Sequence, residues 1–311
     1  MPEVKNYAFF QGKFVPMEEA KVSILTHAFM YGTAIFEGIR AYWNEKQGQM
    51  YLFRADDHLK RMFDSMKIMH MEISYSVEDI SKIMVELLQR NSFKTDTYVR
   101  PCVYKAAQTI GPSLDHNPSE LSILTVPFGD YFHGAQGLKV CVSNWRRVED
   151  NAIPARAKIV GAYANTALAK TDAVVAGFDD CIVLSESGHV SEGSAMNLFL
   201  VKNGVLSTPP QTENILEGIT RDTVFNIAEK ELHLKILSRS IDRSELYIAD
   251  ELFFCGTGAQ IAAIVEVDKR IIGNGSEGPI SKMIRERYIS ICRAEVADYK
   301  NWRTPVYPNK S

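Results

Sequence analysis

The sequence lacks the features that assign a chain to several specialised classes of protein. Its 311 residues contain no apolar run long enough to cross a membrane, no internal repeat and no low-complexity segment, and the formal net charge is only -3. A membrane helix needs about 20 apolar residues, and a chain of near-neutral charge has no general attraction to nucleic acid or to an anionic membrane. We therefore expect neither nucleic acid nor membrane among its partners.

Cysteine is also scarce. The five cysteines are odd in number, widely spaced and mostly set in apolar runs: Cys102, Cys141, Cys181, Cys255 and Cys292. This distribution favours buried free thiols over disulfides or a metal cluster. The first residues carry charges at Glu3 and Lys5 and no apolar core of signal-peptide length. We expect a soluble cytoplasmic protein with no metal site.

What is present is the composition of an ordinary globular protein, with 46% hydrophobic and 23% charged residues. The length admits two domains. A turn-rich stretch, GDYFHGAQG, breaks the apolar pattern at 129–137. Within it we place a linker at 132–136, between a domain of residues 1–131 and a domain of residues 137–311.

Hydrophobic periodicity predicts helices and strands in both halves. Apolar residues recur at helical spacing over 56–69, and Ser76 with Asp79 forms a capping-box pattern before a second helix. Strands are expected as a hairpin at 7–15, at 97–106 and in a run that ends near 128. In the second half we expect strands at 138–145, 181–185, 197–201, 205–209 and 251–258, helices at 163–177, from Thr220 and from about 281, and a hairpin before the last helix.

One nucleotide-binding pattern can be set aside. The stretch GNGSEG at 273–278 matches G-x-G-x-x-G and precedes a predicted helix. A dinucleotide fingerprint must open a βαβ unit, yet only a short polar tail follows that helix. We interpret GNGSEG as a Gly-rich turn at the tip of a hairpin.

Two other glycine-containing stretches suit an anion. Gly218 and Thr220 stand at the start of a predicted helix, where backbone N–H groups and the helix dipole attract negative charge. A plain N-cap threonine is the alternative. The stretch Gly256-Thr257-Gly258 offers a hydroxyl and accessible backbone at the end of a strand.

Three polar residues of the first half are open to two interpretations. Arg61 lies off the apolar stripe of its helix, as a solvated arginine would. Tyr98 and Arg100 point to the same side of a predicted strand, which suits the binding of a carboxylate. An exposed strand face would look the same.

Two lysines and a glutamate complete the candidates. Lys158 precedes a predicted helix, Lys170 lies inside it, and Glu192 lies in a predicted loop between two strands. Each of the three could simply be solvated, and we take Lys170 to be so. An amine nucleophile, an anion cradle and a carboxylate are nevertheless the set that a pyridoxal phosphate enzyme needs.

Six ordered motifs make the chain resemble the branched-chain amino acid aminotransferases, which are fold-type IV pyridoxal phosphate enzymes. They are HAFMYGTAIFEGIRAY at 27–42, YVRP at 98–101, AKIVGAY at 157–163, VSEGSAMNLF at 190–199, LEGITRD at 216–222 and CGTGAQI at 255–261. The resemblance implies an α/β (α+β) fold with a small N-terminal α/β domain and a larger C-terminal α/β domain of pseudo-barrel type. It implies pyridoxal 5′-phosphate as the cofactor, bound in the cleft between the domains.

The resemblance also implies roles for individual residues. Lys158 would bond covalently to the cofactor aldehyde, Glu192 would pair with the pyridine nitrogen, and Tyr163 would hydrogen-bond the phenolic oxygen of the ring. The phosphate would be held by Arg61, Ile219, Thr220 and Thr257. The substrate would be bound by Tyr98, Arg100, the turn of Thr257 and Gly258, and a pocket of Tyr31, Phe36, Gly38, Phe128 and Tyr131.

The implied activity is a ping-pong transamination between L-leucine, L-isoleucine or L-valine and 2-oxoglutarate, by at least a homodimer. Two departures from the family pattern bear on substrate range: Met196 stands where a glutamate is expected, and Phe128 where a tryptophan is common in some members. The alternatives within the fold are a D-amino acid or (R)-amine aminotransferase and an aminodeoxychorismate lyase. Outside it, the alternative is a small-ligand or phosphate-binding protein without catalysis.

Overall fold

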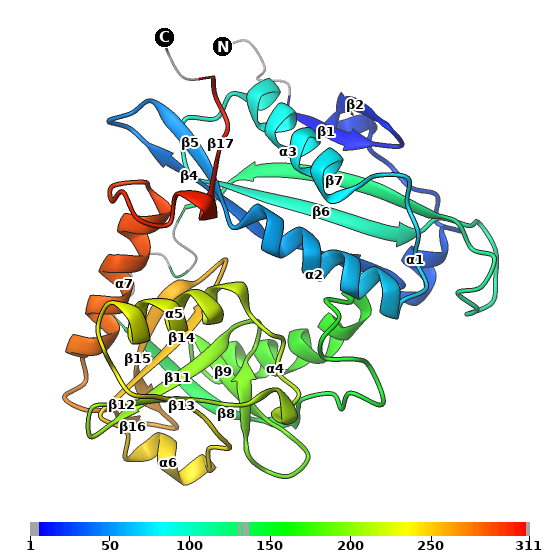
Figure 1. Cartoon of the computed structure of the whole chain (residues 1–311). Helices are drawn as coiled ribbons and strands as arrows, with labels where there is room; N and C mark the ends of the chain where they lie inside the picture. Colours follow the sequence, from blue (N-terminus) through cyan, green and yellow to red (C-terminus); the bar gives the residue numbers. More distant parts are fainter. Residues whose placement is uncertain (1–5, 130–131, 133–136, 309–311) are drawn as a thin grey trace. The chain divides into compact units, whose positions relative to one another are not determined.

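The computed structural model describes residues 6–129, 132 and 137–308. Within them the chain forms two compact units (Figure 1). The first contains residues 6–129, 157–161 and 291–308, and the second contains residues 132, 137–156 and 162–290. The sequence-based division assigned everything after 137 to one domain, whereas the segments 157–161 and 291–308 belong to the first unit. Except for Phe132, the proposed linker 132–136 lies outside the described residues, and so does Tyr131.

The first unit is built on an antiparallel sheet with the strand order β17-β5-β4-β6-β7-β1-β2, in which β3 also pairs with β6. Its strands are β1 (Tyr7–Phe10), β2 (Lys13–Pro16), β3 (Ala34–Phe36), β4 (Ile39–Asn44), β5 (Gln49–Phe53), β6 (Thr97–Lys105), β7 (Ser119–Pro127) and β17 (Arg303–Pro305). Its helices are α1 (His27–Tyr31), α2 (Ala55–Ile68) and α3 (Val77–Asn91). In Figure 1, α2 and α3 lie side by side along the sheet.

The predicted elements of this unit are confirmed. The helix α2 buries Leu59, Met62 and Met66, the apolar stripe read from the sequence, and Ser76 caps α3 in a capping box with Asp79. Periodicity did not predict β3, β4 and β5, because most of their side chains are buried on both faces of the sheet and leave little polar alternation to detect.

The second unit is built on a mixed sheet with the order β10-β9-β8-β15-β14-β11-β12-β13, and β16 pairs with β15. Its strands are β8 (Leu138–Arg146), β9 (Asp180–Leu184), β10 (Val190–Gly193), β11 (Asn197–Lys202), β12 (Val205–Thr208), β13 (Ile236–Ser238), β14 (Glu251–Gly256), β15 (Gln260–Val267) and β16 (Arg270–Ile271). The helices α4 (Tyr163–Val175), α5 (Ile219–Lys230) and α6 (Arg243–Tyr247) follow the chain order, and α7 (Pro279–Cys292) begins in this unit. The helix α4 packs on β8 and β9, and α5 packs on β14.

The predicted strands and helices of the second half are confirmed as well. Between β11 and β12, Asn203 and Gly204 both have positive φ, 49° and 73°, as a two-residue hairpin turn requires. Apolar side chains from β8, β11, β14 and β15 form one buried cluster that includes Leu198, Phe254 and Ile264.

Three predictions about this half are wrong. Glu192 does not lie in a loop but in β10, where its neighbours pair with β9. The stretch at 273–278 is not the tip of a hairpin, because it connects β16 to α7. The tail after α7 is not merely polar: it returns to form β17, which pairs with β5 in the sheet of the first unit. These pairings join segments far apart in the chain, which local patterns do not reveal.

No helix in the described part of the chain is both long and apolar enough to span a membrane. The five cysteines are free thiols. Cys181, Cys255 and Cys292 are buried, and Cys102 and Cys141 are partly buried.

Candidate active site

Lys158 lies in the first unit, in an extended segment held by main-chain hydrogen bonds. Its N–H donates to Ser65 Oγ at 3.2 Å, and its carbonyl accepts from the Phe36 N–H at 3.1 Å. Three residues on, the Gly161 N–H donates to the Gly32 carbonyl at 3.1 Å. The segment is therefore fixed against α2 and the start of β3, and the lysine is presented without a helix beneath it.

The side chain of Lys158 meets an aromatic ring that it shares with an arginine. Lys158 Nζ lies 5.0 Å from the centroid of the Phe36 ring, and the Arg100 guanidinium carbon lies 4.6 Å from the same centroid. Arg100 Nη2 also donates to Tyr98 Oη at 3.0 Å. Both cations are stabilised by the ring quadrupole. The structure thus brings together four residues that the resemblance assigned to the site.

Gly38 and Phe128 belong to the same cluster. A Cβ at position 38 would lie 2.3 Å from Tyr98 Oη, so only glycine leaves room for the tyrosine. The Phe128 ring packs on Tyr98 with the centroids 5.3 Å apart. Tyr31 has other neighbours: its hydroxyl accepts from the Gly111 N–H at 2.9 Å, and its ring lies 4.8 Å from His27.

Arg61 is part of a buried ionic cluster rather than solvated. Its side chain is only 12% exposed. Its Nε and Nη2 donate to the two oxygens of Glu37 at 2.7 and 2.8 Å. His58 Nδ1 lies 2.8 Å from the same carboxylate, which is fully buried. Since positions 58, 61 and 65 lie on one face of α2, this helix supplies His58, Arg61 and the Ser65 that holds Lys158.

The charges in this cluster follow from burial and from the neighbouring groups. Burial alone would raise the pKa of Glu37, but Arg61 and His58 outweigh it and hold that pKa well below its ordinary value. Burial lowers the pKa of His58, and the hydrogen bond to Glu37 offsets this only in part. At neutral pH the cluster therefore holds one cation, one anion and a neutral imidazole. The sequence analysis missed Glu37 and His58; the one signal was a lone acid within AIFEGI.

Glu192, in the second unit, is surrounded by donors. Arg147 Nε lies 3.0 Å from Glu192 Oε1. The Leu216 N–H and Asn197 Nδ2 donate to Oε2 at 3.1 and 3.3 Å. The side chain is almost completely buried. These three nitrogen groups can only donate to the carboxylate, so they favour its ionised form. Arg147 and Asn197 were not singled out from the sequence, because no local pattern marks them.

The start of α5 lies close to this carboxylate. Gly218 is the N-cap residue and carries no side-chain cap, so the interpretation of Thr220 as a plain N-cap is wrong. A Cβ at Gly218 would lie 2.0 Å from Asn197 Oδ1, so the helix start approaches β11 closely. Backbone N–H groups of the first turn, including those of Ile219 and Thr220, form the kind of end that binds phosphate.

The turn of Thr257 and Gly258 begins near the same place. It joins β14 to β15, and Cys255, two residues before Thr257, pairs with Asn197 of β11. Asn197 therefore adjoins Glu192, the start of α5 and the strand that leads into the turn. The second unit brings these predicted residues together around the first residue of β11.

Three further residues have clear positions. Tyr163 is the first residue of α4 and is partly buried. Lys170 Nζ lies 2.6 Å from the buried carboxylate of Asp180, so it is a structural ion pair and not a solvated lysine. Met196 is 5% exposed and belongs to the apolar cluster of the second unit. The departure at Met196 thus contributes to packing.

The donor sets of the two units fit pyridoxal phosphate. The first unit offers an amine at Lys158 and a guanidinium at Arg61, and the second offers a buried carboxylate at Glu192 and a helix N-terminus at α5 for a phosphate. These are the amine, anion-binding and carboxylate groups that this cofactor requires.

Known proteins share these features. The family model described as Amino-transferase class IV matches residues 34–267. A protein of Aquifex aeolicus (strain VF5) named "Probable branched-chain-amino-acid aminotransferase" is 47% identical over 302 residues, which cover 97% of each chain. The solved branched-chain aminotransferase of Thermoproteus uzoniensis with norvaline superposes with a TM-score of 0.93 at 42% identity, covering 97% of this chain and 99% of that one.

Two more solved structures add bound compounds to the comparison. The branched-chain amino acid aminotransferase of Thermobaculum terrenum in its PLP form has a TM-score of 0.93 at 34% identity, covering 98% of this chain and 99% of that one. Another branched-chain amino acid aminotransferase, from a source abbreviated T.th., is complexed with N-(5'-phosphopyridoxyl)-L-glutamate. It has a TM-score of 0.92 at 38% identity, covering 97% of this chain and 99% of that one.

These matches extend over nearly the whole chain. The expectation of a two-domain α/β fold is confirmed, because the solved relatives superpose on both compact units. The chain belongs to the class IV aminotransferase family.

Proposed function

We propose that this protein is a pyridoxal phosphate-dependent aminotransferase that exchanges an amino group between L-branched-chain amino acids and 2-oxoglutarate. The observation that carries the proposal is the pair of cations, Lys158 and Arg100, over the ring of Phe36. It puts an amine able to attack a carbonyl beside a group able to bind a carboxylate. The names of the relatives support the same activity.

Each unit contributes distinct groups to the proposed reaction. Bound pyridoxal phosphate supplies an electron sink for the carbanion at the substrate α-carbon. Lys158 holds the cofactor covalently and, once released by an incoming amino acid, its amine removes the α-proton. Glu192 faces the pyridine nitrogen, Tyr163 the phenolic oxygen, and Arg61, Ile219, Thr220 and Thr257 the phosphate.

The substrate contacts follow from the cluster around Tyr98. Tyr98 and the turn of Thr257 and Gly258 bind the α-carboxylate, and Arg100 binds the distal carboxylate of glutamate or 2-oxoglutarate. Support comes from the relative that was solved with a phosphopyridoxyl derivative of L-glutamate. Phe36, Gly38 and Phe128, with Tyr31 and Tyr131, accept the side chain. D-amino acid transamination and lyase activity are not favoured, because the matched relatives are named branched-chain aminotransferases.

The test uses purified protein incubated with pyridoxal phosphate. We expect a visible absorption band, and glutamate formation when 2-oxoglutarate is supplied with L-leucine, L-isoleucine or L-valine. Activity restricted to D-alanine or (R)-amines would overturn the substrate assignment. Pyruvate release from aminodeoxychorismate without glutamate formation would point to the lyase. A protein that stays colourless would be a binding protein instead.

We propose further that the protein works as at least a homodimer in the cytoplasm. Apolar side chains are exposed around α1 and the nearby residue Ile110: Val22, Ile24, Leu25, Phe29, Met30 and Ile110. Gly111, next to Ile110, contacts both His27 and Tyr31, so these side chains belong to one surface. An apolar patch of this kind suits a second copy of the chain. The five free thiols agree with a reducing compartment.

A further inference from the structure

Arg147 follows directly after β8, and its side chain is 12% exposed. Its Nε lies 3.0 Å from Glu192 Oε1 and also donates to the Asn214 carbonyl at 3.1 Å. The preceding arginine differs: Arg146 is exposed, and its Nη1 donates to the Glu186 carbonyl at 3.3 Å. Of two adjacent arginines, one is thus committed to a buried carboxylate.

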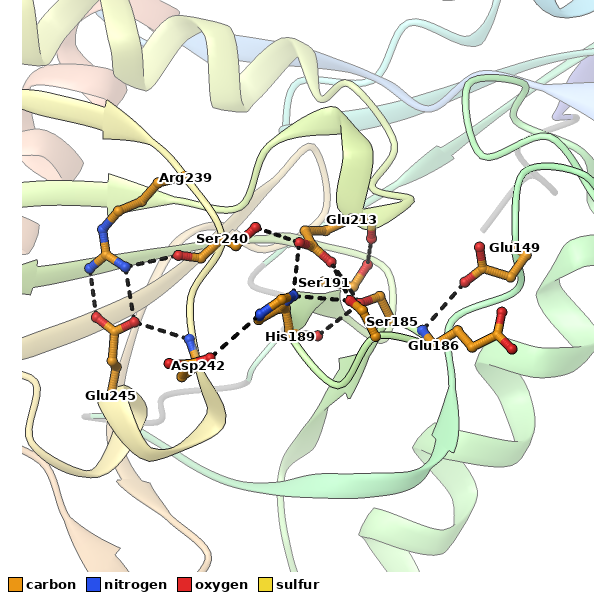
Figure 2. Close-up of polar contacts among 11 residues, drawn as sticks. Glu149, Ser185, Glu186, His189, Ser191, Glu213, Arg239, Ser240, Asp242 and Glu245 are labelled. Carbon is orange, nitrogen blue, oxygen red and sulfur yellow. Dashed lines mark hydrogen bonds and ion pairs between the residues drawn. The ribbon is translucent and has the colours of Figure 1, made fainter.

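The loop that Arg147 contacts is itself firmly held. Asn214 follows Glu213, whose carboxylate accepts hydrogen bonds from Ser185 and Ser240, each at 2.6 Å, and lies 3.2 Å from His189 (Figure 2). The Glu213 carbonyl accepts from Ser191 Oγ at 2.6 Å, beside Glu192 in β10. Arg147 therefore joins Glu192 to a loop that is fixed by an independent polar network.

The same loop leads to two other site features. Its Leu216 N–H donates to Glu192 Oε2, and two residues later Gly218 begins α5. Oε2 is held by neutral amide donors, from Leu216 and Asn197, whereas Oε1 faces a full positive charge. The charge on Arg147 is thus the one feature among these contacts that distinguishes an ionised Glu192 from a merely hydrogen-bonded one.

We propose that Arg147 is a positioning residue that fixes the proton of the pyridine–carboxylate pair on the cofactor nitrogen. This rests on the proposed function. A proton shared by pyridine and carboxylate resides mainly on the more basic partner, and a guanidinium at 3.0 Å makes Glu192 the less basic one. The protonated ring is the stronger electron sink, so Arg147 acts on the reaction through Glu192 without touching the substrate.

The test measures the proton directly. Protein reconstituted with pyridoxal phosphate labelled with nitrogen-15 in the ring gives a nitrogen chemical shift that separates protonated from neutral pyridine. We expect the wild type to be protonated at neutral pH. Arg147→Gln should reduce the ratio of ring-protonated to Glu192-protonated forms about tenfold or more, the factor that one pKa unit represents. Arg147→Lys, which keeps the charge, should restore it, and Arg146→Gln should match the wild type.

A nitrogen shift in Arg147→Gln equal to that of the wild type, with folding verified by circular dichroism, would overturn the proposal. If Arg147→Gln does not fold, the wild type decides alone, because a neutral ring nitrogen at neutral pH contradicts the assignment and a protonated one supports it. Failure of the proposed function is a different result: wild-type protein would then bind no pyridoxal phosphate, and no ring signal of bound cofactor would be seen.

Discussion

Arg61 and Glu37 form a two-pronged ion pair, with hydrogen bonds of 2.7 and 2.8 Å, around a carboxylate that is fully buried. Removing one partner of a buried pair leaves the other charge without compensation in a region of low dielectric. We expect Glu37→Gln to lower the free energy of unfolding by about 3–5 kcal/mol, measured by denaturant titration.

The matched control for that variant is the exposed helical pair of Glu86 and Arg90, whose Oε1 and Nη2 are 2.6 Å apart. Glu86→Gln should cost less than about 1 kcal/mol, because solvent screens a surface pair. Equal losses in the two variants would show that the cluster at Glu37 is not the buried ion pair described above.

His58 gives the stability a pH dependence of defined sign. Its pKa in the folded protein lies below the ordinary 6.5. As the pH falls below that value, the unfolded chain takes up a proton that the folded protein does not, so stability is present above it and declines below it. The slope for one proton approaches about 1.4 kcal/mol per pH unit. The lowered pKa of Glu37 acts in the same direction, but only below its ordinary 4.5.

His58→Gln should flatten the curve of unfolding free energy against pH between about pH 5 and 6.5, where an ordinary histidine titrates. His116→Gln is the control, because His116 is 94% exposed, and it should leave the curve of the wild type unchanged. A His58→Gln curve as steep as that of the wild type in this window would refute the assignment.

The two lysines of the Lys158 segment and α4 should behave oppositely. Borohydride reduction of the protein with bound pyridoxal phosphate, followed by peptide mapping, should place the label on Lys158. Lys158→Ala should lose at least about 10²–10⁴-fold in kcat, the usual worth of a positioned proton-transfer group. Lys170→Ala should keep kcat and lose stability, because it leaves the buried Asp180 without its partner at 2.6 Å. Label on Lys170 would reverse both roles.

Gly38 tests the substrate-binding cluster. A Cβ there would lie 2.3 Å from Tyr98 Oη and 2.9 Å from the ring carbon that carries it, so Gly38→Ala must displace a rigid ring. We expect kcat/KM for branched-chain amino acids to fall by about 10- to 100-fold, since small misplacements in a binding site are costly. Gly129→Ala is the control, because a Cβ there meets no described atom within 4 Å. Similar kinetics for both variants would remove Tyr98 from the site.

The apolar surface around α1 tests the proposed dimer. Phe29 is 65% exposed and Ile24 is 76% exposed. Placing a charge in an apolar interface leaves it unpaired and desolvated, so Phe29→Glu should shift the protein towards monomers in sedimentation velocity. Ile248→Glu is the control: Ile248 is 63% exposed but follows α6 in the second unit. A monomeric wild type, or equal effects of both variants, would contradict this interface.

Local patterns predicted the elements with one buried face. The stripe of Leu59, Met62 and Met66 and the Ser76 cap needed only nearest neighbours in the chain, and both are confirmed. The strand β10 was missed because its four residues are all buried, and β17 because it forms only by pairing with β5. Neither feature has a period of its own.

The same division applies to the site. Motif spacing was enough to single out Lys158, Glu192, Tyr98 and Arg100, because their chemistry is readable from residue type and order. It could not show that Lys158 and Arg100 share the ring of Phe36, since positions 36, 100 and 158 are brought together only by β3, β6 and the main-chain bonds at Lys158.

The sequence by itself determined the family, the reacting amine and the carboxylate expected to face the cofactor, because these depend on residue types in a fixed order. Only the tertiary structure decided which charges support them: Glu37 and His58 on Arg61, and Arg147 on Glu192. A side chain's charge is written in the chain, but its partner and its burial are set by elements that are distant in sequence. Those two quantities decide where protons and charges reside.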